Sequence, residues 1–330
     1  MKRWEGTENE DIIINEQIQK GIEAIKEQRK RKEKTMTYFI DFIKNLLQKK
    51  NIGVIIYLVL NTLLVISIFN VGATTSQEAL TSTFLAIVIY IISLAITLSP
   101  IGEWLLRLQT GSKKIKRQEQ VERLEPLFNE VYKKAKDLHP TLNDNIELFI
   151  NDDSSPNAFA TGRKTITINR GLLKYSDEQI KAVLAHEFAH IAHKDTDITL
   201  IILIGNFLVT FLFLFIRIIA FITGLVFANY QKSIGELIKT IVIDLMLVFL
   251  MRVWTKIGVL LVSHSSRQKE FEADKFAYNC GYGNELAEVL DTFHGVKASG
   301  PWAALISSHP DIDNRIAQLQ KLGATYRNAY

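Results

Sequence analysis

Three residues with the chemistry of a hydrolytic metal centre lie within five consecutive positions near the middle of the chain. His186, Glu187 and His190 form the pattern H-E-x-x-H. Residues four apart lie one turn apart on one face of an α-helix, so the two imidazoles can bind one Zn²⁺ ion at about 2.0–2.1 Å. Glu187 lies about 100° further round the helix, outside the ligand shell but close to a water molecule on the metal. The spacing therefore predicts a zinc site with Glu187 as general base.

The alternative is a solvated helix whose two histidines have ordinary hydrogen-bond partners. Ser176 and Gln179 form a capping-box pattern, which predicts a helix over about 177 to 194. The residues around the motif are mostly apolar, which predicts that this helix is buried. Two buried imidazoles on one face need partners, and a shared metal ion provides one. The apolar positions are Val183, Leu184, Ala185, Phe188, Ala189 and Ile191.

A catalytic zinc ion has three protein ligands and an open fourth position. His193 and Asp195 are candidates for the third ligand because they follow closely in the sequence. A metzincin pattern would require a histidine at position 196, but the residue there is Thr196. The nearby sequence alone therefore does not complete the site.

A later segment offers a better third ligand. Glu270 and Asp274 lie one helical turn apart. Glu270 can bind the ion, and Asp274 can accept the free N–H of a ligating histidine, for which His186 is the candidate. Glu272 lies between them on another face and is expected to be solvated. The predicted cofactor is one Zn²⁺ ion per chain, since two histidines and a glutamate favour zinc over Mn²⁺ or Co²⁺.

Attack of a metal-activated water on a carbonyl group also needs a hydrogen-bond donor for the developing oxyanion. His309, in the sequence Ser308-His309-Pro310, is the candidate, and Arg315 lies nearby in the sequence. A histidine in a surface loop is the alternative interpretation.

Long apolar segments predict that the chain crosses a membrane. Residues 52–71 and 80–100 carry no charge, and each can span a hydrocarbon core about 30 Å thick. Lysines and arginines flank this hairpin on both outer sides but are absent between its two segments, which places both its ends in the cytosol. The alternative, a buried soluble hairpin, is unusual for two such segments side by side. The flanking basic residues are Lys49, Lys50, Arg107, Lys113, Lys114, Lys116 and Arg117.

A second apolar pair follows the H-E-x-x-H motif. One segment runs from Ile198 to Ala228, and another runs from about Ile241 to Val262. Three charged residues, Asp244, Arg252 and Lys256, make the last segment the least typical span. Ionisable groups at membrane depth usually face a bundle interior or a cavity, so we expect Arg217 and Asp244 to pair.

The amino-terminal part of the chain is charged and helical in pattern. Isoleucines recur at helical spacing and are followed by a basic run at 29–32, which indicates a solvated helix with one apolar stripe or a helix for self-association or partner binding. An apolar face within 39–47, flanked by lysines, suits a helix at the membrane surface. This polar beginning is not the pattern of a cleavable signal peptide. The recurring isoleucines are Ile14, Ile18, Ile22 and Ile25.

Composition excludes other classes of function. The chain has 330 residues, a net charge of +4 and 48% hydrophobic residues. Cys280 is the single cysteine, so neither an internal disulfide framework nor a cysteine-based zinc site is possible. The small net charge, without basic residues interleaved with aromatics, gives no indication of nucleic-acid binding.

Four motifs in this order resemble the HtpX family of membrane-embedded zinc metalloproteases and, more distantly, the prenyl-CAAX endopeptidases. The resemblance extends from about residue 120 to the carboxyl end. The motifs are Pro156-Asn157-Ala158-Phe159-Ala160, His186 to His190, Glu270-Phe271-x-Ala273-Asp274, and His309-Pro310 with Arg315. The charged amino-terminal extension is a departure from that family.

The resemblance implies a role for each motif. His186, His190 and Glu270 would be the zinc ligands, Glu187 the catalytic base, and His309 a residue near the transition state. The stretch Asn157-Ala158-Phe159-Ala160 would be an edge strand that binds an extended substrate by strand addition, with Arg315 as a further substrate-binding candidate. A core aromatic is the alternative interpretation of Phe159.

The expected fold is α+β, mainly helical, with about four transmembrane helices and a zincin-type protease domain carrying a small sheet. That sheet would be built from 146–151 and 164–169. The expected domains are a charged extension (1–50), a transmembrane hairpin (51–103), and a protease domain (113–330) interrupted by a second helix pair at 197–262.

The expected function is a zinc endopeptidase, integral to the membrane, with its active site and both termini in the cytosol. Its substrates would be polypeptides, above all membrane or misfolded proteins, in quality control. One alternative is a processing protease for lipidated or signal-bearing tails. Another is a non-catalytic membrane scaffold that contains zinc.

Overall fold

The computed structural model describes residues 19–23, 25–29, 33, 36–37, 40–292 and 312–326, apart from the side chains of 203–207, 259 and 262–267. The chain divides into two units, Met1–Asn45 and Leu46–Tyr330. In the first unit, residues 19–23 and 25–29 are helical and exposed, including Ile22 and Ile25. The other two isoleucines of the apolar stripe lie outside the described residues, so a partner for this helix stays a prediction.

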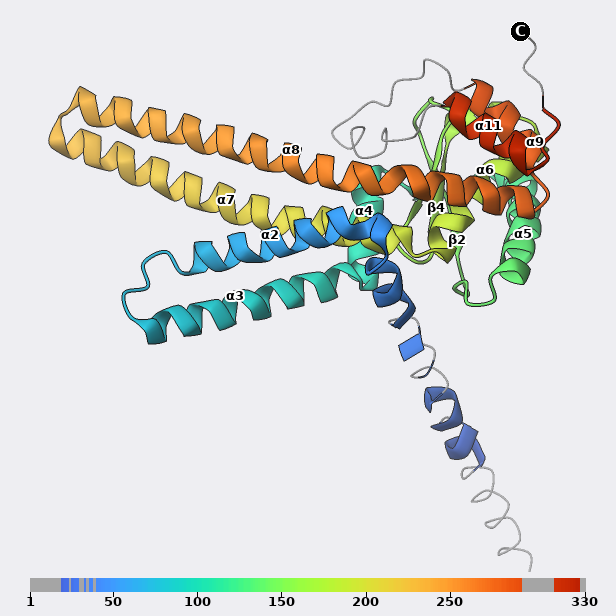
Figure 1. The fold of residues 1–330 in the computed structure, drawn as a ribbon, viewed down its shortest axis with the longest axis horizontal. Coiled ribbons are helices and arrows are strands. Elements are labelled where there is room, and N and C mark those ends of the chain that lie inside the picture. The colour runs from blue at the N-terminus through green and yellow to red at the C-terminus, as the bar shows by residue number, and fades with distance from the viewer. Residues whose placement is uncertain are drawn as a thin grey trace, which may run out of the picture. The chain divides into compact units, whose positions relative to one another are not determined.

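Two long helical hairpins extend from the same side of the domain that contains the sheet (Figure 1). The first consists of α2 (Ile52–Phe69), preceded by the short helix η1 (Lys49–Asn51), and α3 (Ser76–Thr97). The second consists of α7 (Asp195–Gln231) and α8 (Ile234–Asn279). Three helical segments are long and apolar enough to cross a membrane, within the part of the chain that is described: Lys49–Phe69, Ser76–Thr97 and Leu208–Gln231. The fourth predicted span lies in α8, where charged residues interrupt the apolar run.

Glycines allow the first hairpin to pack closely on α8. A Cβ atom at Gly53 would lie 2.1 Å from the backbone oxygen of Leu261, and one at Gly258 would lie 2.7 Å from the ring of Tyr57. The Tyr57 ring also lies beside Trp254, with ring centroids 6.4 Å apart. The amino-terminal half of α2 is therefore held against the same helix that later supplies Glu270.

The predicted pairing of Arg217 with Asp244 is confirmed. The guanidinium Nε donates to Oδ1 at 2.5 Å and Nη2 donates to Oδ2 at 2.8 Å. The pair joins α7 to α8 and lines a cavity of about 430 Å³ between them. Two-point contact of this kind neutralises both charges within the apolar hairpin.

Reversing either charge of this pair is expected to lower the amount of protein in the membrane. An unpaired charge at membrane depth costs roughly 2.5–3.5 kcal/mol on insertion scales. Arg217→Asp or Asp244→Arg alone should therefore reduce the protein several-fold on immunoblots of membrane fractions, and the double reversal should restore it. Lys232→Asp, an exposed position at the hairpin loop, is the matched control. A double variant as depleted as the singles would contradict an energetic role for the pair.

Among the described residues, the sheet has four strands in the order β1-β2-β4-β3. Strand β4 is buried along its whole length, pairs in parallel with β2 and antiparallel with β3, and leaves β3 at the edge. The prediction of a small sheet in a mainly helical α+β fold is confirmed. The strands are β1 (Lys113–Lys114), β2 (Glu147–Asn151), β3 (Ala158–Thr161) and β4 (Thr165–Asn169).

The helix with the H-E-x-x-H motif, α6 (Asp177–Ala192), is buried against the sheet and its neighbouring helices. It begins with the predicted capping box between Ser176 and Gln179. Phe188 packs against the rings of Phe128 and Tyr132 on α5, with centroids 5.1 and 5.6 Å apart. The other elements of this domain are α4 (Pro100–Thr110), α5 (Gln118–Leu138), η2 (Arg170–Lys174), α9 (Gly283–Thr292) and α11 (Ile312–Leu322).

The turn after edge strand β3 is held by α4, the helix that follows the first hairpin. Gly162 has φ +60°, and a Cβ atom there would lie 2.4 Å from the Glu103 side chain. The carboxylate of Glu103, on α4, accepts the backbone N–H of Arg163 at 2.7 Å. Arg163 in turn pairs with the buried Asp197 on α7, with Nε 3.3 Å from Oδ1. Three elements therefore meet at this turn and position the edge strand.

Candidate metal centre and active site

Two imidazoles lie side by side on the buried face of α6. The Nε2 atoms of His186 and His190 are 3.2 Å apart, and their ring planes are nearly perpendicular, at 86°. This arrangement follows from the four-residue spacing, which places both side chains on one face one turn apart.

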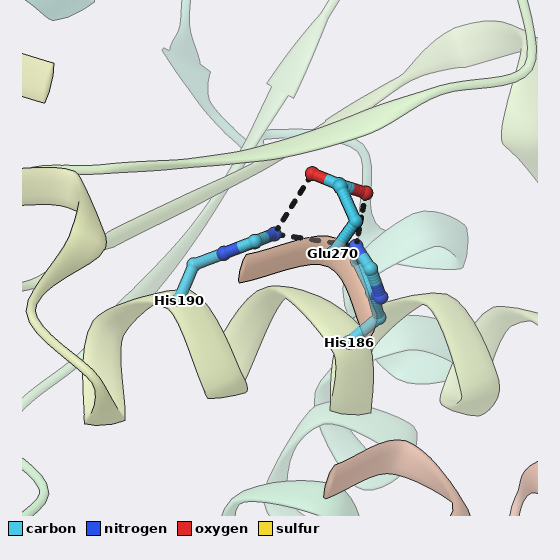
Figure 2. Close-up of side chains that lie close together, drawn as sticks. All are labelled: His186, His190 and Glu270. Carbon is cyan, nitrogen blue, oxygen red and sulfur yellow. Dashed lines mark hydrogen bonds and ion pairs between the residues drawn. The ribbon is translucent and has the colours of Figure 1, made fainter. Parts of the chain in front are cut away.

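Glu270 completes the cluster from α8, as Figure 2 shows. Its carboxylate oxygens lie 3.4 Å from Nε2 of His186 and 3.6 Å from Nε2 of His190. Donor atoms of all three side chains fall within 4.8 Å of one another. No other group of three histidine, cysteine or carboxylate side chains converges in this way among the described residues.

The donor set fits a divalent metal ion. Two ligands about 2.0–2.1 Å from one ion, at tetrahedral angles, lie roughly 3.3 Å from each other. The three observed donor separations, 3.2, 3.4 and 3.6 Å, are close to that value. Two imidazole nitrogens and one carboxylate are the ligands that catalytic zinc sites use, with one position left open.

Asp274 lies behind His186, on the side away from the cluster. Its Oδ1 is 2.9 Å from Nδ1 of His186, which leaves Nε2 of that ring turned toward Glu270. Burial alone would lower the pKa of His186, but hydrogen bonds to Asp274 and Glu270 raise it to about 10. In the absence of a metal, a proton is therefore well held in the cluster, and a metal ion must displace it.

Arg315, on α11, contacts the carboxylates of both Asp274 and Glu270. Its Nε and Nη2 donate to the carboxylate of Asp274 at 2.8 and 2.6 Å, and Nη1 lies 3.2 Å from Oε2 of Glu270. Burial by itself would raise the pKa of Asp274, but the Arg315 guanidinium and the His186 imidazole lower it. Asp274 is therefore an ionised acceptor for the imidazole N–H, which is the arrangement that orients a ligating histidine.

Asp195 lies beside His190, at the start of α7. Its Oδ2 is 3.4 Å from Nδ1 of His190, and it lies on the opposite side of the ring from Glu270. Sequence spacing admitted Asp195 and His193 as third ligands, but neither belongs to the converging group. Asp195 instead lies next to Nδ1 of His190, as Asp274 lies next to Nδ1 of His186.

Glu187 points toward the edge strand. Its Oε2 accepts the backbone N–H of Ala160 at 2.8 Å, so the carboxylate is held between α6 and β3. The stretch Asn157 to Ala160, which was predicted to bind substrate, therefore contacts Glu187 through Ala160. Ala158 is buried, and Phe159 is half-buried rather than part of the deep core.

Some predicted site residues have contacts that differ from the prediction, and one lies outside the described residues. His309 lies outside the described residues, so its role stays a prediction. Arg315 was predicted to bind substrate, and its guanidinium is buried against Asp274 and Glu270. Glu272 was expected to be solvated; its side chain is 34% exposed, and it also pairs with Lys50 from η1. No sequence spacing indicated that contact, since the two residues come from segments far apart in the chain.

Comparisons with known proteins agree with this chemistry. The model of a family described as peptidase family M48 matches residues 118–323. "Protease HtpX" of Psychrobacter sp. is 29% identical over 248 residues, which cover 67% of this chain and 78% of that protein. "Protease HtpX" of Hahella chejuensis is 35% identical over 190 residues, covering 49% and 61%. "Protease HtpX homolog" of Acidovorax ebreus is 31% identical over 191 residues, covering 51% and 62%.

The alignments with the last two relatives thus span about three-fifths of each relative's length. Among solved structures, the crystal structure of S. mikatae Ste24p aligns with 87% of this chain and 66% of its own, at 19% identity and a TM-score of 0.42. The family match covers more than half of the chain and includes His186, His190 and Glu270. This chain therefore belongs to peptidase family M48 and is a membrane metalloprotease, a hydrolase of peptide bonds.

Proposed function

We propose that this chain is a zinc endopeptidase in which His186, His190 and Glu270 hold the ion and Glu187 is the general base. The observation that carries the proposal is the convergence of three donor atoms, from two helices, within 4.8 Å of one another. Family membership implies a metal, and two imidazoles with one carboxylate favour zinc.

The protein side chains divide the work of hydrolysis. His186, His190 and Glu270 would hold the ion, which would supply Lewis acidity to acidify water and polarise the scissile carbonyl. Glu187 takes a proton from the attacking water and later delivers it to the leaving amine. The Ala160 N–H holds the Glu187 carboxylate in place before substrate arrives, and Asp274 holds His186. His309 is proposed as the donor to the developing oxyanion.

Edge strand β3 is the proposed site for the substrate backbone. One edge of β3 pairs with β4, and the other borders Glu187. An extended peptide can add to such an edge by main-chain hydrogen bonds, with Asn157 to Ala160 as the receiving residues. Arg315 contacts Glu270 and Asp274, which gives it a part in holding the ligands. Contact of Arg315 with substrate stays a prediction.

We propose membrane or misfolded proteins as substrates, in quality control, with the active site and both termini on the cytosolic side. Apolar helices long enough to span a bilayer enter the same domain as the metal cluster. Basic residues flank the first hairpin at both outer ends, which supports a cytosolic position. Profiling of cleavage products separates this proposal from a processing protease: many unrelated cleavage sites support quality control, and one dominant site supports processing.

Removal of the metal should abolish activity reversibly. Purified full-length protein is expected to contain one zinc ion per chain by elemental analysis and to cleave casein. Treatment with a strong chelator should reduce cleavage to background, and one equivalent of Zn²⁺ should restore it. A Mg²⁺ addition is the control, because that ion prefers all-oxygen ligands. Full cleavage by protein shown to be free of metal would contradict the proposed function.

A further inference from the structure

The side chain of Lys50, at the start of the first membrane helix, is buried and ion-paired. A lysine next to a membrane span usually extends its ammonium group to water or lipid headgroups. Lys49 follows that pattern and is exposed. The Lys50 side chain is only 6% exposed, and its Nζ contacts the carboxylate of Glu272 on α8.

A second ion pair lies next to this one and touches a metal-binding residue. Nζ of Lys269, on α8, is 3.6 Å from Oδ1 of Asp195, and both side chains are at most 10% exposed. The other oxygen of Asp195 is the one that lies 3.4 Å from Nδ1 of His190. Contacts therefore run from Lys269 through Asp195 to the His190 imidazole.

The two pairs are electrostatically linked. Lys269 and Glu272 lie three residues apart on α8, where side chains are neighbours. Burial lowers the pKa of Lys269, Asp195 raises it, Lys50 lowers it and Glu272 raises it, so all four charges act on one region. Two positive and two negative charges balance there. Three of the four side chains are at most 10% exposed, and Glu272 is 34% exposed, so loss of one charge leaves its partner to interact with the remaining charges nearby.

We propose that Lys50 is a positioning residue for the metal centre. Because Lys50 pairs with Glu272, Lys269 is free to pair with Asp195. Asp195 then orients the His190 ring. The proposal rests on the proposed function, because it requires His190 to bind the metal. The start of the first membrane helix then has two roles: it anchors the chain in the membrane, and it helps to orient a metal ligand.

Without Lys50, Glu272 becomes a competing acceptor for Lys269. Lys269 can then turn from Asp195, which leaves the His190 orientation less well defined. Loss of outer-shell support of this kind typically costs about 10–100-fold in metal affinity. Removing Glu272 as well eliminates the competitor, so the double change should be less damaging than loss of Lys50 alone. A purely structural role for Lys50 predicts no such rescue.

The test measures Zn²⁺ affinity of the full chain in lipid nanodiscs, by competition with a chelating dye. Lys50→Met should weaken zinc binding by about 10-fold, whereas Lys49→Met and Lys50→Arg should bind as the wild type does. Lys50→Met with Glu272→Gln should recover most of the affinity. Lys269→Met should bind zinc weakly with or without Glu272→Gln, because Asp195 no longer has the ammonium group of Lys269 as a partner. Thermal unfolding of the zinc-free variants is measured in parallel.

Equal affinity in Lys50→Met and Lys49→Met would overturn the proposal, and so would a double variant as weak as Lys50→Met. A lower melting temperature with unchanged zinc affinity would also overturn it, because that result means a structural role. Failure of the proposed function would look different, since the wild type itself would then bind no zinc or show no hydrolysis.

Discussion

Replacing Glu187 with glutamine is expected to leave zinc binding intact and to reduce peptide hydrolysis by at least about 100-fold, since general base catalysis contributes about 10²–10⁴-fold. Glutamine has nearly the same shape and still has an oxygen that can accept the Ala160 N–H, so the contact between α6 and β3 is kept. It cannot take a proton from water at neutral pH. Glu187 is not a member of the converging ligand group, so zinc content should stay at one per chain.

The measurement combines kcat and KM on a fluorescent peptide or casein with elemental analysis of the same preparation. A lower kcat with little change in KM is the expected signature, because the lost interaction acts in the transition state. Glu178→Gln is the matched control, since Glu178 lies on the same helix but is exposed to solvent. Turnover near the wild-type rate in Glu187→Gln would rule out Glu187 as the base.

Replacing Glu270 with alanine is expected to affect the metal itself. The carboxylate is the proposed third ligand, and its loss should lower zinc affinity by more than the about 10–100-fold typical of outer-shell partners. A second effect acts in the same direction: Arg315 would lose one of its two acidic partners, so less negative charge would remain beside the ion. Turnover should fall with zinc occupancy.

The two variants separate metal binding from chemistry. Glu187→Gln should contain zinc but be inactive, whereas Glu270→Ala should be inactive because it binds no zinc at low zinc concentration. Partial recovery of Glu270→Ala at high Zn²⁺ would agree with a ligand role. Lys275→Ala, at an exposed position on the same helix, is the control for damage to α8. Tight binding of one zinc ion by Glu270→Ala would show that another group completes the site.

The membrane arrangement connects these expectations to the rest of the molecule. The first hairpin packs on α8 through Gly53 and Gly258 and contacts it again through Lys50. On α4, which follows the hairpin, Glu103 holds the turn that follows β3. Both the proposed ligand helix and the proposed substrate strand are therefore in contact with the elements that flank the first membrane helices.

Several features of this protein could be predicted from the sequence because they depend on local periodicity. The spacing of His186 and His190 places two imidazoles on one helical face wherever that helix lies. The Ser176 capping box and the long uncharged segments likewise indicate their own structure, since helix ends and membrane spans depend on nearby residues. The pairing of Arg217 with Asp244 was also predictable, because two opposite charges in adjacent apolar helices have few other partners.

Only the tertiary structure decided which distant groups meet these local elements. Sequence spacing left Asp195 and His193 as candidates beside Glu270, but the packing of α8 on α6 brought Glu270 to the imidazoles and left Asp195 behind His190. Packing also placed Arg315 against Asp274, and Lys50 against Glu272, which had been expected in solvent. Contacts between segments depend on how helices stack, how closely glycines let them approach and which buried charges need neutralising. None of these has a signature in the spacing of residues along one segment.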